Sequence, residues 1–123
     1  MKQNNAVLEK SLCFAVRVVN LCRYLQTAHD EHVLSRQILR SGTSIGANIR
    51  EAQHGQSRRD FLSKMNIALK EATETEYWIE LLFQSNYLNE AEYKSIITNS
   101  IELKKILASI SISTKEKYKK PNS

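Results

Sequence analysis

The chain has 123 residues, which is enough for one domain and too few for most two-domain enzymes. Hydrophobic residues make up 41% and charged residues 25%, the usual balance of a soluble globular protein. With only three glycines and one proline, it lacks the turn chemistry of a sandwich, a barrel or a glycine-rich nucleotide loop. Its 18 basic and 13 acidic side chains give a net charge of +5, which permits a polyanionic partner.

Two cysteines and the pattern of charge indicate the compartment. Cys13 and Cys22 are nine residues apart on one predicted helix, so they point to opposite sides and cannot form a disulfide with each other. Charged residues interrupt the N-terminal region, which therefore lacks the apolar core of a secretory signal. No stretch approaches the ~20 apolar residues of a membrane span. We expect a cytoplasmic protein with two small buried or half-buried thiols and no membrane contact.

Hydrophobic periodicity predicts four helices, at about residues 5–27, 31–54, 58–86 and 90–113. Ser57 with Asp60 and Asn89 with Glu92 are capping signals for the third and fourth helices. Long helices joined by short loops favour antiparallel neighbours. The prediction is an all-α protein in which residues 1–114 form an antiparallel up-down-up-down four-helix bundle, followed by a basic flexible tail over 115–123.

The first and last helices each carry two apolar stripes. A helix with two such stripes needs two burial partners, which indicates self-association in addition to folding. On the first helix one stripe is Phe14, Val18, Leu21 and Leu25, and the other is Leu8, Leu12, Ala15, Val19 and Cys22. On the last helix one stripe is Ile96, Ser100, Leu103, Leu107 and Ile110, and the other is Ile97, Ile101, Ala108 and Ile112.

The second helix combines glycines with a polar stripe. Gly42 and Gly46 lie inside the helix, where we expect them to permit close approach of a neighbouring helix. The stripe has two interpretations, a solvated flank or a partly buried network in which Arg40 pairs with a carboxylate of the third helix and Asn48 forms a bridge. The sequence supports a catalytic role less well, because the stripe lacks a nucleophile and base with an orienting third group. Its members are Gln37, Arg40, Ser44, Asn48 and Glu51.

A carboxylate-rich third helix raises the alternative of a metal site. Di-iron bundles need a Glu-x-x-His pair on each of two helices, and Glu51 with His54 is a single match. His29 and His32 fall in a predicted polar loop. We therefore expect no metal, no cofactor and no catalytic residue. The carboxylates concerned are Glu71, Glu74, Glu76 and Glu80.

Positive charge is concentrated in the first half of the chain. Residues 1–59 hold nine basic and four acidic side chains, whereas residues 60–114 hold five basic and eight acidic ones. Arginine suits bidentate contacts to phosphate, although these side chains could equally neutralise the acidic third helix. No usual RNA- or DNA-binding motif is present. The candidate nucleic-acid-binding residues are Arg17, Arg23, Arg36, Arg50, Arg58 and Arg59.

The stretch 40–51 (RSGTSIGANIRE) resembles the four-helix-bundle family of 23S rRNA-intervening-sequence proteins. The stretch 68–78 (ALKEATETEYW) and residues 86–88 are similar to that family's third helix and following turn. The chain departs from relatives at Arg50, Lys70 and Glu71, where small residues are common. The residues that match the family's polar signature are Arg40, Ser44, Asn48, Glu51, Glu74 and Glu76.

The resemblance implies a homopentameric, barrel-like assembly without enzymatic activity. Members can be encoded within insertions of bacterial 23S rRNA genes, and a related accessory protein of diversity-generating retroelements is a basic pentamer that partners a reverse transcriptase and nucleic acid. We therefore expect a non-catalytic, homo-oligomeric helical scaffold whose basic surface binds RNA, DNA or a nucleic-acid enzyme such as a reverse transcriptase. The alternative is a purely protein-binding adaptor with no nucleic-acid contact.

Overall fold

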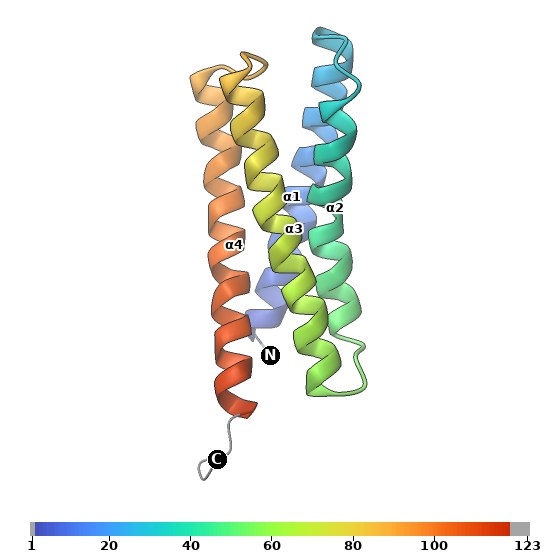
Figure 1. Cartoon of the computed structure of the whole chain (residues 1–123), viewed down its shortest axis with the longest axis vertical. Helices are drawn as coiled ribbons and strands as arrows, with labels where there is room; N and C mark the ends of the chain where they lie inside the picture. Colours follow the sequence, from blue (N-terminus) through green and yellow to red (C-terminus); the bar gives the residue numbers. More distant parts are fainter. Residues whose placement is uncertain (1, 119–123) are drawn as a thin grey trace.

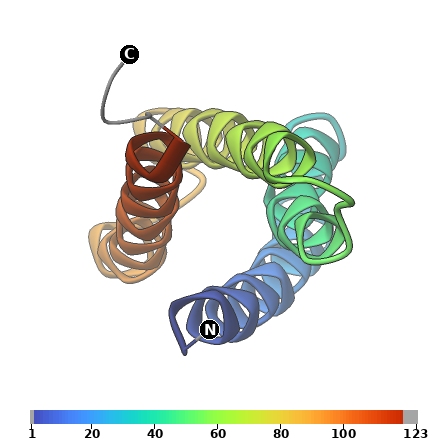
Figure 2. The ribbon, with the colours of Figure 1, turned by 90° about the horizontal axis from the view of Figure 1, so that it is seen from below.

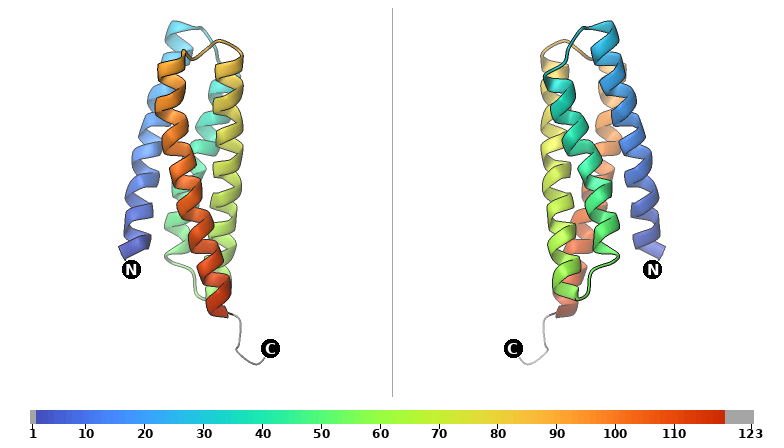
Figure 3. Two further views of the ribbon diagram at one scale, coloured as in Figure 1. Left: turned by 90° about the vertical axis from the view of Figure 1, so that its left-hand side faces the viewer. Right: turned by 90° about the vertical axis from the view of Figure 1, so that its right-hand side faces the viewer.

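The computed structural model describes residues 2–118, which form four long helices with no strand among them. The helices are α1 (Lys2–Ala28), α2 (Leu34–Ala52), α3 (Arg58–Gln84) and α4 (Glu90–Tyr118). Each runs opposite to the one before it, so the start of α1, the end of α4 and the α2–α3 loop lie at one end of the bundle (Figures 1 and 3). The predicted four-helix bundle is confirmed.

Local polar contacts fix where α3 and α4 begin. The Ser57 hydroxyl accepts the backbone N–H of Asp60 at 3.1 Å. Asn89 and Glu92 exchange bonds in both directions, each donating its backbone N–H to the other's side chain at 2.8 Å. Both pairs therefore cap their helices and satisfy amide groups that the first helical turn leaves without a partner, Asn89–Glu92 as the full capping box and Ser57–Asp60 through the serine's bond.

Helix α2 begins three residues later than predicted, because Glu31 caps it from outside. The nearly fully buried Glu31 carboxylate accepts the backbone N–H groups of Val33, Leu34 and Ser35 at 3.0, 2.8 and 2.8 Å. Burial alone would raise the pKa of Glu31, but these three hydrogen bonds stabilise the charged form and lower its pKa below the ordinary value. Glu31 is therefore an anionic cap.

Helix α4 continues to Tyr118, so the predicted tail begins too early. Thr114 donates its hydroxyl to the carbonyl of Ile110 at 2.7 Å, and Lys115 and Lys117 lie in the last turn, where positive charge favours the helix dipole. The rest of the predicted tail, residues 119–123, lies outside the described residues. Helices α2 and α3 each end two residues earlier than predicted.

The helices form an open arc. Seen along its length, the bundle places α1 beside α2, α2 beside α3 and α3 beside α4, while the arc stays open between α1 and α4 (Figure 2). The α1–α4 pair has the sparsest contact of the four neighbouring pairs. The core therefore lies on the inner faces of α2 and α3, with one face each from α1 and α4. The largest fully buried side chains include Leu25, Ile38, Ile45, Ile49, Met65, Ile79, Leu82, Leu103 and Leu107.

Helices α1 and α2 approach closely at a glycine, as the sequence predicts. A Cβ atom added at Gly42 would lie 2.8 and 2.9 Å from the two γ-carbons of Val18, closer than packed carbon atoms come. At Gly46 the nearest atom to an added Cβ would be the Ser11 hydroxyl oxygen, at 3.3 Å. Gly42 is thus needed for the close approach, whereas Gly46 leaves a little more room.

Several hydroxyl groups are buried in the core, and one lacks a partner. Thr75 donates to the Ser41 hydroxyl at 2.9 Å, and Ser111 donates to the Asn66 amide oxygen at 2.7 Å. Ser100 is 1% exposed, and its hydroxyl is the one buried side-chain oxygen or nitrogen in the described part of the chain without a hydrogen bond. Ser100 therefore occupies a core position on α4 at an energetic cost.

Ser100→Ala is expected to leave the bundle as stable as the original or to stabilise it by about 1 kcal/mol, because it removes a buried polar group that has no partner. Urea unfolding followed by circular dichroism measures the difference. The matched change Ser111→Ala breaks a hydrogen bond to Asn66 and is expected to destabilise the protein. Equal destabilisation by both changes would contradict the assignment.

Candidate functional site

Arg40 connects the polar stripe of α2 to α3. Its guanidinium donates to the Glu71 carboxylate at 3.2 Å and also pairs with Glu74. The indole N–H of Trp78 donates to the same Glu74 oxygen at 3.1 Å. Glu71, one of the positions where the chain departs from its relatives, is thus accommodated by Arg40. The arrangement joins α2 to α3, and the carboxylates of Glu71 and Glu74 lie half-buried beside the Arg40 guanidinium.

The remaining members of the stripe do not join this cluster. The Ser44 hydroxyl and the Asn48 amide donate to carbonyls of their own helix, at 2.7 and 2.8 Å. Glu51 pairs with Lys64 at 2.8 Å, and Glu76 of α3 pairs with Lys104 of α4 at 3.1 Å. The six residues of the polar signature therefore form three separate interhelical contacts with local bonds between them, and among residues 2–118 Asn48 bonds to the backbone of its own helix.

The six candidate arginines do not form one patch. Arg23 and Arg36 are exposed near the α1–α2 loop, and Arg50, Arg58 and Arg59 are exposed near the α2–α3 loop at the other end of the bundle (Figure 1). Fourteen residues of helix separate Arg36 from Arg50, or about 21 Å at 1.5 Å per residue. Arg17 is half-buried between helices. The structure therefore divides the predicted set into two exposed groups and one interhelical side chain.

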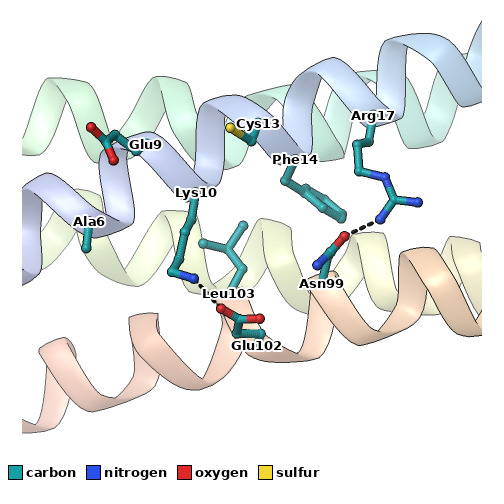
Figure 4. A pocket seen from close by; sticks show the side chains of 9 residues that line it. All are labelled: Ala6, Glu9, Lys10, Cys13, Phe14, Arg17, Asn99, Glu102 and Leu103. Atoms are coloured by element: carbon teal, nitrogen blue, oxygen red, sulfur yellow. Dashed lines mark hydrogen bonds and ion pairs between the residues drawn. The ribbon is translucent and has the colours of Figure 1, made fainter.

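Arg17 belongs to a polar seam between α1 and α4. Its guanidinium donates to the backbone carbonyl of Ser95 at 3.1 Å, to the Ser95 hydroxyl at 2.8 Å and to the Asn99 amide oxygen. Lys10, two turns before Arg17 on α1, pairs with Glu102, which lies one turn after Asn99 on α4 (Figure 4). These contacts span an open cleft of about 330 Å³ whose lining includes the core residues Phe14 and Leu103. Side-chain bridges therefore supplement the sparse packing of α1 against α4.

Apolar side chains are also exposed on the outer faces of α1 and α4. On α1, Leu12 is 56% and Val16 is 54% exposed, and Leu12 lines a shallow cleft beside Ala47 of α2. On α4, Ile101 and Ile112 are 37% and 58% exposed. On each helix one of the two predicted stripes enters the core and the other is only partly covered, and Val16, which belongs to neither predicted stripe, lies one turn from Leu12. These two exposed sets, which we call the α1 face and the α4 face, are candidate interaction surfaces.

The cysteine and acidic residues show no arrangement for chemistry within the described residues. Both cysteines are free, and Cys13 is exposed rather than buried or half-buried as predicted, while Cys22 is buried. Over residues 2–118, no three histidine, cysteine or acidic side chains gather as metal ligands would. None of the described helices is both long and apolar enough to cross a membrane.

Sequence reasoning missed the Glu31 cap and the α1–α4 seam. The cap is predictable in principle, since an acidic residue directly before an apolar helical run can accept the first amide groups of that helix. The seam has no local signal, because Arg17 and Asn99 are 82 residues apart. Only the register of α1 against α4 brings these two side chains together.

Comparison with known proteins places the chain in a family. Residues 3–109 match the family described as 23S rRNA-intervening sequence protein. The fold is similar to a crystal structure of a protein of unknown function from the S23 ribosomal protein family of Bacteroides thetaiotaomicron. The two share 58% sequence identity with a TM-score of 0.87, over 89% of this chain and 97% of that one. No curated protein matches significantly. The chain belongs to the 23S rRNA-intervening sequence protein family.

Proposed function

We propose that this protein is a non-catalytic scaffold that assembles from several copies of itself and presents a basic surface to nucleic acid or to a nucleic-acid enzyme. The observation that carries the proposal is the pair of exposed apolar faces on α1 and α4. On α1, Leu12 and Val16 are exposed in adjacent turns, and a small monomer seldom leaves such a pair of large aliphatic side chains without a partner to cover it. A second copy supplies such a cover.

The two faces favour a particular kind of assembly. The α1 face and the α4 face lie on different helices, so a contact that joins one to the other uses two different surfaces of the chain. Such heterologous contacts generate a closed ring when the rotation between copies closes, and a filament when it does not. The homopentamer implied by the family resemblance is a ring of this type.

Val16→Glu is expected to convert the assembly into monomers that keep their helical content. The glutamate would place a charge in the proposed contact, while Val16 is exposed enough in the single chain to tolerate it. Sedimentation velocity measures the assembly and circular dichroism measures the fold. Gln37→Glu adds the same charge at an exposed position of α2, and it should leave the assembly unchanged. A Val16→Glu protein that sediments like the original would contradict the proposed contact.

One observation favours the adaptor alternative. Arg17 and Arg40 are occupied by contacts within the chain, so part of the positive charge balances itself. An adaptor would capture a protein partner from a lysate in a manner that survives nuclease treatment. A nucleic-acid-binding scaffold would instead show direct binding to purified RNA or DNA that weakens steeply as salt rises.

A further inference from the structure

Charge in this protein is sorted along the length of the bundle. Around the α2–α3 loop and the end of α4, residues 50–64 and 112–117 contain six basic and three acidic side chains. At the opposite end, residues 23–36 and 84–94 contain three basic and four acidic ones. The first set lies at the end of the bundle where α1 begins, α4 ends and the α2–α3 loop turns (Figures 1 and 3). We call it the basic end, with Arg50, Arg58, Arg59, Lys64, Lys115 and Lys117 as its cations.

Several of these cations are available to a ligand. Arg50 and Arg59 are exposed, and within residues 2–118 neither guanidinium has a hydrogen bond or ion pair. Arg50 also lines the shallow cleft beside Leu12, so it borders the α1 face. Lys115 and Lys117 are likewise exposed in the last turn of α4. Lys64 is held by Glu51 at 2.8 Å. The basic end therefore presents at least four side chains whose charge the fold does not use, in contrast to Arg17 and Arg40.

The chemistry of these groups suits a phosphate backbone. Guanidinium groups form paired hydrogen bonds with phosphate oxygens, and lysines add charge without demanding geometry. The cations come from α2, α3 and α4, so they spread over the width of the bundle end instead of lining one helix. Such a spread of cations complements a repeating polyanion better than it complements a single small anion.

Self-assembly would strengthen this surface. A cyclic ring repeats every feature of one copy in equivalent positions, so the basic ends of neighbouring copies lie on the same side of the ring. The excess positive charge then adds from copy to copy, and binding to a polyanion becomes stronger and more dependent on salt. This step rests on the proposed assembly.

We propose that the basic end, centred on Arg50 and Arg59, is the surface that binds the phosphate backbone of nucleic acid. The inference deepens the proposed function by assigning its nucleic-acid contact to one end of the bundle. Arg23 and Arg36, which the sequence groups with Arg50 and Arg59, lie at the other end and do not take part.

The test uses the full chain and two purified probes, a structured RNA hairpin and a DNA duplex of similar length. Fluorescence anisotropy measures binding over a series of salt concentrations. Arg50→Gln/Arg59→Gln is expected to weaken binding about tenfold or more at low salt and to reduce the log–log salt slope by about 2. Arg23→Gln/Arg36→Gln removes the same charge from the other end and is expected to change affinity less than about threefold. Arg50→Lys/Arg59→Lys should keep most of the binding.

The possible outcomes distinguish a failure of this inference from a failure of the proposed function. Equal losses from both double glutamine variants, or no loss from Arg50→Gln/Arg59→Gln, would overturn the assignment to the basic end while the protein still binds nucleic acid. If the original chain binds neither probe at low salt, the nucleic-acid part of the proposed function fails as well. Displacement of the probes by an equal charge of polyglutamate would show a surface for acidic protein and overturn the assignment. Circular dichroism and sedimentation confirm that each variant stays folded and assembled.

Discussion

Gly42→Ala is expected to destabilise the bundle by about 1–2 kcal/mol, although alanine is the better helix former by about 1 kcal/mol. The added Cβ would lie 2.8 and 2.9 Å from the γ-carbons of Val18, which is fully buried. Valine has one strongly preferred rotamer in a helix, so its methyl groups cannot turn aside, and α1 must move away from α2. Urea unfolding measures the loss, which Gly42→Val should enlarge.

Two further variants test the cause. Gly46→Ala places its Cβ 3.3 Å from a serine hydroxyl, so the helix-propensity gain should largely offset the crowding. In the double variant Val18→Ala/Gly42→Ala the two γ-carbon contacts are absent and only the contact with the Cβ of residue 18, at 3.2 Å, remains, so the second change should cost much less than Gly42→Ala does alone. If the changes in unfolding free energy caused by Val18→Ala and Gly42→Ala are strictly additive, contact with Val18 is not the reason that Gly42→Ala destabilises the protein.

Glu31→Gln is expected to destabilise the protein by about 2 kcal/mol at pH 7, because three amide groups lose a charged acceptor. The folded-state pKa of Glu31 lies below its ordinary value of 4.5, so the carboxylate stabilises the fold above that value. The stabilisation is lost as the pH falls from the unfolded pKa through the folded one. The difference between the original protein and Glu31→Gln should therefore shrink on acidification below pH 4.5.

Urea unfolding at pH 7 and at several values below 4.5 measures this difference. Glu9→Gln changes an exposed glutamate of α1 and serves as the control, with an expected effect within about 0.5 kcal/mol. A Glu31→Gln difference that stays constant over the whole pH range would contradict the role of the charged cap.

The sequence predicted what short-range patterns determine. The Ser57–Asp60 and Asn89–Glu92 caps involve residues three apart, and both occur in the structure, the second with both bonds of a capping box and the first with the bond to the serine hydroxyl. The close approach at Gly42 was also predictable, because a glycine that interrupts a strong helical pattern usually has a packing reason. The partner, Val18, was not predictable, since it depends on the register between two helices.

The remaining features depend on how the helices pack against one another, which the sequence pattern does not give. The apolar periodicity of α1 shows two stripes, but only the bundle determines that Phe14 enters the core while Leu12 stays exposed. The charge difference between halves of the sequence likewise became a difference between ends of the bundle, because antiparallel helices carry distant residues to the same end (Figure 1). Arg36 and Arg50 are close in sequence and lie at opposite ends.

Self-association is the central claim, and sedimentation equilibrium of the unmodified chain tests it most directly. At micromolar loading we predict a mass several times that of one chain, which stays constant as the loading is varied over this range. Dissociation should follow only after the α1 face is altered by Val16→Glu. A mass equal to one chain at every loading would contradict the claim, because the exposed apolar faces of α1 and α4 would then have no copy to cover them.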